Sequence, residues 1–349
     1  MIPDCILDSI TKLVRKFIWA KDNNGKGLHL VGWKIITNPK SEGGLGIKDL
    51  KHMKNALLSK HALELMNDGD KIWIKLMVSK YGRIDPWQVS TLKKVSWTFR
   101  GLMYSVRSVK NSITQVNVIN SNHVLHDPWL FDTPLIMMPT FINMQYDMTT
   151  MLIKDLRSNY HWNWTLVCEL FPPSLTAVIE EKQVHEDEDR VRWKLKKKTE
   201  GKSITAAIYE DCRYKDSNPQ WIGWKKLWKL KIIPKIKIFL WKMLHGRLPT
   251  SQYLQSLGIG TSDLCSLCNS TLETSYHLFV ECRVTQLVWL RIRNEGFLQS
   301  WNLFNQDLTQ GGWLEGTNLG YLNNESNAGE LISCTLWAIW ISRCNHLFR

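Results

Sequence analysis

The amino-terminal segment MIPDCILDSITKLVRKFIW mixes apolar and polar positions at helical spacing. Its larger apolar side chains recur every three or four residues, which places one set on a single helix face: Ile6, Ile10, Leu13, Val14 and Phe17. Charged and small polar residues occupy the positions between them. The pattern therefore predicts an amphipathic helix at the start of the chain.

A second helix is predicted after the loop NPKSEGGLGIKDL. Asp49 can cap this helix, and one side of it carries a set of mostly apolar residues: Met53, Leu57, Leu58, His61, Leu65 and Met66. The glycines raise the possibility of phosphate binding, but GGLG has neither the spacing of a P-loop nor that of a dinucleotide-binding fingerprint. A tight turn is the better interpretation, and residues 1–82 are predicted to be a helical segment.

The middle of the chain, residues 83–215, shows no sustained period. Its prolines and short mixed segments predict loops, brief helices and an irregular α+β connector. The alternation in VRWKLKKK predicts a strand with Val191, Trp193 and Leu195 facing inward. The acidic run 186–189 could be mistaken for a catalytic or metal-binding cluster, but consecutive acids point in different directions, so a solvated loop is favoured.

Residues 219–250 return to helical spacing. Trp221, Trp224 and Trp228 share one side of a first helix, and Pro234 interrupts the pattern. A second helix then has an apolar face followed by Gly246 as a plausible C-cap; the residues on this face are Ile236, Phe239, Leu240, Met243 and Leu244. Thr250 can cap a third helix that ends near Gly258.

The same stretch contains no acidic residue. Its positive charges are Lys225, Lys226, Lys229, Lys231, Lys235, Lys237, Lys242 and Arg247. Lysines interleaved with tryptophans are typical of nucleic-acid surfaces, where ammonium groups meet phosphates and rings stack on bases. Tryptophans at helical spacing also pack cores, so we expect the rings to be mainly core and the cations to face a polyanion.

The composition supports a folded, basic protein. The chain has 349 residues, of which 44% are hydrophobic, and it contains 18 tryptophans. Its formal net charge of +13 should attract polyanions, nucleic acid first and acidic membranes second.

The chain is predicted to be soluble and intracellular, in the nucleus or cytoplasm, and not secreted. Asp4 and Asp8 stand where a signal peptide would be basic and then apolar. The apolar run 331–342 is too short to span a bilayer, so no membrane partner is expected. Five of the eight cysteines are scattered, which argues against a disulfide framework.

The other three cysteines lie with a histidine in LCSLCNSTLETSYHLFVEC, at the spacing C-x2-C-x8-H-x4-C. A C-x2-C pair on a tight turn directs two thiolates at one point, and Asn269 and Ser270 suit such a turn. Four soft ligands would fill a tetrahedral shell and leave no position for water. We therefore predict one structural Zn²⁺ held by Cys265, Cys268, His277 and Cys282. The alternative is three cysteines close by chance beside a core histidine.

His277 is expected in a short helix that opens near Thr274. Residues five apart do not share an α-helical face, so this helix should stop or distort before Cys282. The eight-residue second gap also differs from the four residues of the retroviral knuckle. The module therefore need not bind single-stranded bases as that knuckle does.

The segments WKKLWKLKIIPKIKIFLWKMLHGRLPT and CSLCNSTLETSYHLFVEC, followed by Val288–Trp289, resemble the zinc-binding domain downstream of the reverse transcriptase in plant non-LTR (LINE-type) retrotransposons. The segment from Phe17 to Met66 is similar to the region after the polymerase palm in such elements. LWAIWISRCNHLF is similar to the connector towards their RNase H domain.

This resemblance implies that residues 216–300 are the zinc-binding domain and that residues 301–349 lead towards RNase H. Reverse transcription needs paired metal-binding aspartates, and no adjacent Asp-Asp pair occurs in the sequence. The endonuclease and the acidic RNase H centre of such elements are also expected to be missing. We therefore expect a retrotransposon fragment that is not an enzyme; an active polymerase would require the missing aspartate pair.

The predicted fold is mainly α, with a helical N-terminal region, an irregular α+β middle and a small Cys3His zinc-binding helical domain. The predicted role is non-catalytic binding of RNA or DNA, with no small-molecule substrate. The alternative is a protein-interaction or scaffold module that uses the tryptophan-rich helices.

Overall fold

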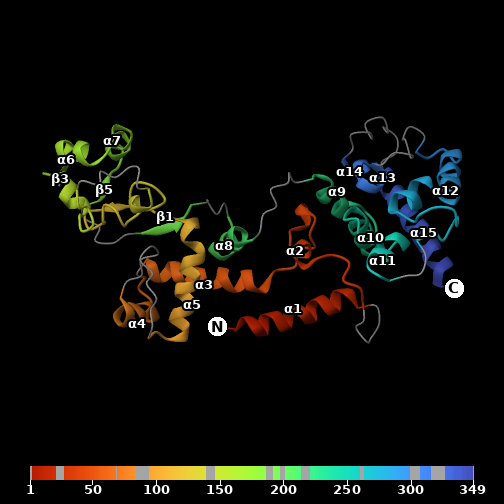
Figure 1. Cartoon of the computed structure of the whole chain (residues 1–349), viewed down its shortest axis with the longest axis horizontal. Coiled ribbons are helices and arrows are strands. Elements are labelled where there is room, and N and C mark those ends of the chain that lie inside the picture. The colour runs from red at the N-terminus through yellow and green to blue at the C-terminus, as the bar shows by residue number, and fades with distance from the viewer. Residues whose placement is uncertain are drawn as a thin grey trace. The chain divides into compact units, whose positions relative to one another are not determined.

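The computed structural model divides into two compact units: unit 1 is Met1–Asp8 with Asp49–Asp216, and unit 2 is Ser9–Lys48 with Ser217–Arg349. Each unit is described by itself (Figure 1). The structure describes residues 2–20, 27–67, 69–82, 94–138, 146–185, 192–196, 201–213, 221–259, 263–298, 307–315 and 327–348. The predicted acidic loop 186–189 lies outside these ranges.

Helices dominate both units, so the prediction of a mainly α fold is confirmed. Helix α1, Asp4–Trp19, begins in unit 1 and ends in unit 2. The other helices of unit 1 are α3 (Leu50–Met66), α4 (Ile72–Tyr81), α5 (Trp97–Val109), α6 (Trp164–Leu170), α7 (Pro173–Glu180) and α8 (Ile204–Cys212). Those of unit 2 are α2 (Trp33–Ile36), α9 (Gly223–Lys229), α10 (Pro234–Leu244), α11 (Ser251–Ser256), α12 (Arg283–Asn294), α13 (Asp307–Gln310), α14 (Gly312–Glu315) and α15 (Ala328–Phe348). Within the described residues, no helix combines the length and apolar character that crossing a membrane requires.

Helix α1 forms as predicted, but its apolar face is not covered. Ile6, Ile10 and Leu13 are exposed, and Phe17 is 84% exposed. Helical periodicity predicts which side chains share a face, and it carries no information on whether that face is buried.

Helix α3 corrects the predicted orientation of the second helix. Asp49 caps it through Oδ1, which accepts from the backbone amides of Lys51 (2.9 Å) and His52 (3.1 Å), as expected. Leu57 and His61, however, are exposed. The helix packs against both α5 and α8, and the buried side chains that allow this include three small ones: Ala56, Ser59 and Ala62. Because α3 approaches its neighbours through small side chains, its contact face does not stand out in the sequence as a row of large apolar residues.

The middle of the chain combines short helices with short strands, as predicted. Strand β1 (Ile113–Gln115) pairs antiparallel with β6 (Trp193–Leu195) in the register Ile113↔Leu195. Trp193 is buried and Leu195 packs against the same core, as expected, while Val191 lies outside the described residues. The remaining strands form two further pairs: β2 (Val118–Ile119) with β5 (Val184–His185), parallel, and β3 (Arg157–Ser158) with β4 (His161–Trp162), antiparallel.

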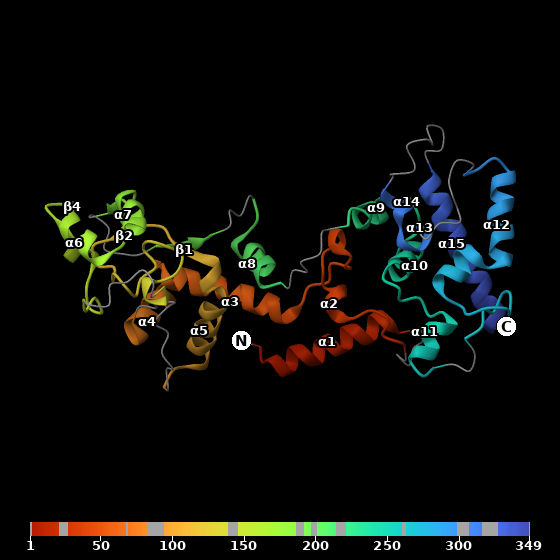
Figure 2. The same cartoon turned by 45° about the horizontal axis from the view of Figure 1, so that its top comes forward.

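Unit 2 is built around α10 and α15, which lie together in both views (Figures 1 and 2). Pro234 begins α10, so the predicted interruption falls between α9 and α10. The ring of Phe239 on α10 lies 5.3 Å from that of Trp337 on α15 and 6.1 Å from that of Phe279. The core of unit 2 therefore joins segments on both sides of the predicted metal ligands.

The GGLG loop is a tight turn in unit 2, as expected. Gly43 has φ 82°, and its carbonyl accepts hydrogen bonds from Trp241 Nε1 (2.7 Å) and His245 Nε2 (2.8 Å). Burial lowers the pKa of His245 and favours the neutral imidazole. Because a carbonyl only accepts, Nε2 must carry the ring proton. The turn is thus anchored to the indole and imidazole beneath it.

Replacing Gly43 with alanine should destabilise unit 2 by about 2–4 kcal/mol, because the left-handed backbone strains a Cβ and the core resists added volume. The new Cβ would lie 2.8 Å from Trp224 Cε2. Denaturant unfolding followed by tryptophan fluorescence measures the change. Gly32→Ala is the control, because its φ is −64° and its Cβ would meet nothing within 4 Å. Equal stability of the two variants would contradict the assigned strain.

Candidate metal centre

The first two predicted ligands lie on a narrow hairpin. Leu264 and Leu272 form an antiparallel bridge, and the Cys265 amide donates to the Thr271 carbonyl at 2.7 Å. Asn269 has φ 54° and its amide donates to the Cys265 carbonyl at 2.8 Å. Asparagine tolerates this left-handed conformation better than most residues, so the sequence favours the turn.

Of the other two predicted ligands, His277 begins a π-helical turn, His277–Glu281, and Cys282 directly follows it. The His277 amide donates to Thr274 Oγ1 at 2.8 Å, and the Cys282 amide donates to the His277 carbonyl at 2.7 Å. This bond joins residues five apart, which is the spacing of a π-helix and not of an α-helix. The expected distortion before Cys282 is therefore present, and it brings residues 277 and 282 to one side.

Two buried hydrogen bonds fix this turn against α12. Thr285 Oγ1 donates to the Leu278 carbonyl at 2.7 Å, and Trp289 Nε1 donates to the Phe279 carbonyl at 2.9 Å. Trp289 is fully buried. A widened turn leaves carbonyl groups without their usual helical donors, and these two side chains supply donors instead.

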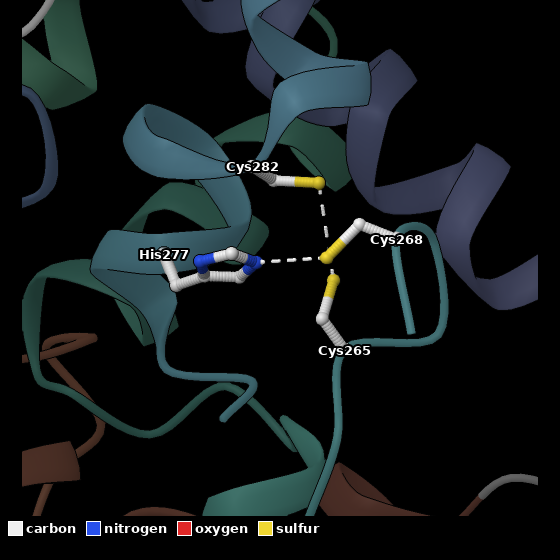
Figure 3. A group of neighbouring side chains, drawn as sticks. All are labelled: Cys265, Cys268, His277 and Cys282. Carbon is white, nitrogen blue, oxygen red and sulfur yellow. Dashed lines mark hydrogen bonds between the residues drawn. The ribbon is translucent and has the colours of Figure 1, made fainter. Parts of the chain in front are cut away.

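The structure brings the four residues into one buried cluster (Figure 3). Their ligand atoms all lie within 4.8 Å of one another, with Cys265 Sγ 3.9 Å from Cys282 Sγ and Cys268 Sγ 3.3 Å from His277 Nε2. Around a tetrahedral zinc ion with bonds of about 2.3 Å, sulfur ligands stand about 3.8 Å apart. The cluster therefore fits a small zinc-binding domain.

The thiols of this cluster have unequal acidities. Burial raises the pKa of Cys265 to about 12. Burial also opposes ionisation of Cys268, but hydrogen bonds with Ser270 and His277 outweigh it and lower the pKa of that thiol to about 6. A bound cation deprotonates coordinating thiols outright, so a thiol that is costly to ionise alone becomes a stable thiolate beside the metal.

The other nitrogen of His277 also has a partner. Thr271 Oγ1 lies 3.0 Å from Nδ1 and 3.1 Å from Nε2, and the Glu281 carboxylate lies 3.9 Å from Nδ1. A carboxylate on the Nδ1 side helps to fix the orientation of the ring, in which Nε2 lies 3.3 Å from Cys268 Sγ.

A buried ion pair lies beside the cluster, and no pattern in the sequence indicated it. Glu273 is 0% exposed and Arg343, on α15, is 2% exposed. Arg343 Nε lies 3.1 Å and 3.3 Å from the two carboxylate oxygens of Glu273. Burial raises the pKa of Glu273, but Arg343 and the Ser251 and Ser266 amides outweigh it and hold that pKa below its ordinary value.

The eight cations predicted to contact nucleic acid divide into two groups. Five are exposed: Lys225, Lys229, Lys231, Lys235 and Arg247. The other three are half-buried: Lys226, Lys237 and Lys242. Lys237 Nζ donates to the Trp228 carbonyl at 2.9 Å, and Lys242 Nζ lies 5.2 Å from the centre of the Trp19 ring. The half-buried lysines therefore take part in the packing of unit 2.

The tryptophans among these cations pack inward. Trp241 is 1% exposed, and Trp221, Trp224 and Trp228 pack partly buried against the core of unit 2. The Trp224 ring stacks on that of His245 at 4.6 Å. The rings are core, as expected from their helical spacing.

The segment that contains this centre matches a known protein family. Residues 204–289 match the family described as zinc-binding in reverse transcriptase. This match confirms the resemblance of the segment to a reverse transcriptase zinc-binding domain that was found in the sequence. The matched segment includes Cys265, Cys268, His277 and Cys282.

Two proteins of Arabidopsis thaliana are similar to the chain. One, named "Putative ribonuclease H protein", is 25% identical over 372 residues, a match that covers all of this chain and 57% of that protein. The chain thus spans little more than half the length of this relative. The other, an uncharacterized mitochondrial protein, is 24% identical over 131 residues, which cover 36% of this chain and 84% of that protein. No solved structure matches.

Proposed function

We propose that the chain is a non-catalytic, nucleic-acid-binding part of a LINE-type retrotransposon polyprotein, held in shape by one structural zinc ion. The proposal places it in the nucleus or cytoplasm and gives it RNA or DNA as a partner. The division into segments 1–82, 83–215, 216–300 and 301–349 stays a prediction. The observation that carries the proposal is the set of five exposed cations on or beside α9 and α10, in the same unit as the metal centre.

The exposed cations come from a stretch of sequence without acids, although the Glu330 carboxylate accepts from the Lys231 amide at 3.1 Å. No acidic residue occurs between Asp216 and Asp263, and the exposed cations of this stretch lie on or beside α9 and α10. The tryptophans between them pack inward, so the lysines project from a rigid base. Backbone phosphates are the complementary charge for such a surface, and they are contacted without regard to sequence.

The proposed zinc ion would stabilise the fold of unit 2 and take no part in catalysis. Cys265, Cys268, His277 and Cys282 would complete a tetrahedral shell, and the buried cluster leaves no ligand position for water. The absence of an adjacent aspartate pair in the sequence supports the non-catalytic role. A primer-extension assay that yields product would overturn that part of the proposal.

The alternative is a protein-interaction module that uses the tryptophans. Trp221, Trp224, Trp228 and Trp241 already pack against the chain's own core, which gives this alternative less support.

Salt dependence tests the proposal directly. Five phosphate contacts predict a slope of about −3.5 to −4.5 in a plot of log affinity against log salt concentration. Between 50 and 200 mM salt, the affinity should therefore fall about 100- to 500-fold. Fluorescence anisotropy with labelled structured RNA, single strands and duplex DNA measures both quantities. Absence of binding to all three at 50 mM salt would contradict the proposal.

A further inference from the structure

The carboxylate of Glu273 joins three segments of unit 2. Its Oε1 accepts from the Ser251 amide at 2.7 Å, at the start of α11. Its Oε2 accepts from the Ser266 amide and from Ser266 Oγ, both at 3.2 Å. Arg343 of α15 binds both oxygens. Backbone amides, hydroxyl groups and a guanidinium group therefore all donate to this buried charge.

Ser266 lies between two predicted zinc ligands, Cys265 and Cys268. Glu273 holds the Ser266 amide from one side, and its own amide donates to the Asp263 carbonyl at 2.8 Å. The carboxylate thus fixes the turn on which both thiols sit. Two sulfur atoms can bind one ion only while that turn keeps its shape.

Arg343 fixes Glu273 in turn. Its guanidinium carbon lies 5.0 Å from the centre of the Trp340 ring, one helical turn earlier on α15. A buried carboxylate without a cation would be strongly destabilising. The shape of the ligand turn therefore depends on a side chain of α15, which lies outside the matched residues 204–289.

We propose that Arg343 is a positioning residue of the zinc site: through Glu273 it holds the Cys265–Cys268 turn in its ligating shape, so that metal binding and the docking of α15 stabilise each other. The inference rests on the zinc ion of the proposed function. It extends the zinc-binding unit beyond the three cysteines and the histidine to the helix α15 (Ala328–Phe348). Such coupling is reciprocal, since each event favours the same conformation.

Metal titration of the full chain tests whether Arg343 of α15 strengthens metal binding. Arg343→Met should weaken Co²⁺ and Zn²⁺ binding about 10- to 100-fold, the usual effect of losing an outer-shell partner. The double variant Glu273→Gln/Arg343→Met should recover part of this loss, because no charge is left buried and the glutamine oxygen still accepts from one of the two serine amides. The other carboxylate oxygen becomes an NH2 group, which can donate to the hydroxyl of the other serine. Visible Co²⁺ absorption reports the ligand set, and competition with a chelator gives the zinc affinity.

The matched control is Arg291→Met. Arg291 also pairs with a glutamate, Glu295, at 2.8 Å, but both side chains are exposed and lie on or beside α12. This variant should bind metal as the wild type does. Wild-type affinity in Arg343→Met would overturn the proposal, and so would equal losses in the two arginine variants.

Hydrogen exchange of the wild-type chain tests whether the bound metal stabilises α15. This experiment does not depend on the folding of any variant. Stripping the metal with a chelator should raise amide exchange in residues 328–348 at least tenfold, while α3 in unit 1 keeps its protection. Unchanged exchange in residues 328–348 would overturn the coupling. If the wild type binds neither Zn²⁺ nor Co²⁺, the zinc site itself is refuted and this inference falls with it.

Discussion

Replacing Cys268 with serine should reduce the zinc content of the purified chain from about one ion to near zero and unfold much of unit 2. Serine keeps the size of the side chain but supplies no thiolate. Structural zinc contributes roughly 10–16 kcal/mol of apparent binding energy in small modules, and that energy is available only to the folded state. Atomic absorption gives the zinc content, and amide exchange over residues 263–298 reports the folding of the site.

Unit 1 provides the internal reference for this experiment. Its cores contain none of the four ligands, so exchange in α3 and α5 should not change. Cys168→Ser, at an exposed position on α6, is the matched control and should keep its zinc. Equal zinc in the Cys268 and Cys168 variants would refute the metal site.

The part of this centre that the sequence predicted is the part encoded by short-range spacing. The C-x2-C turn, the fitness of Asn269 for that turn and the distorted helix before Cys282 all follow from residues a few positions apart. Each is a local consequence of backbone geometry, so a single sequence suffices to predict it. The same holds for Asp49 as the cap of α3.

The parts of the structure that the sequence did not predict depend on contacts between residues that are distant in the sequence. Arg343 and Glu273 are 70 positions apart, and Gly43 and Trp241 are 198 apart. A single glutamate or glycine gives no indication of its partner at such a distance. Leu57 and His61 of α3 were assigned to the wrong side for a related reason: the close contacts of α3 use alanine and serine, which a search for large apolar side chains overlooks.

Reversing three exposed lysines, as Lys225→Glu/Lys229→Glu/Lys235→Glu, should lower nucleic-acid affinity at least about 100-fold at 0.1 M salt. Each lost phosphate contact removes about 0.7–0.9 from the salt slope, so the slope should become shallower by about 2–2.7. These side chains are exposed, and the tryptophans beneath them keep their packing. The stability and zinc content of the variant should therefore match the wild type.

A matched triple variant separates local contact from overall charge. Lys75→Glu/Lys80→Glu/Lys154→Glu makes the same change in net charge at exposed positions of unit 1. If the cations beside α9 and α10 contact phosphates, this control should keep its slope and lose affinity only through weak long-range repulsion, which salt at 0.1 M screens beyond about 10 Å. Equal losses in the two triple variants would assign the binding to net charge alone. A protein partner that binds the wild type and the first triple variant equally would instead support the interaction-module alternative.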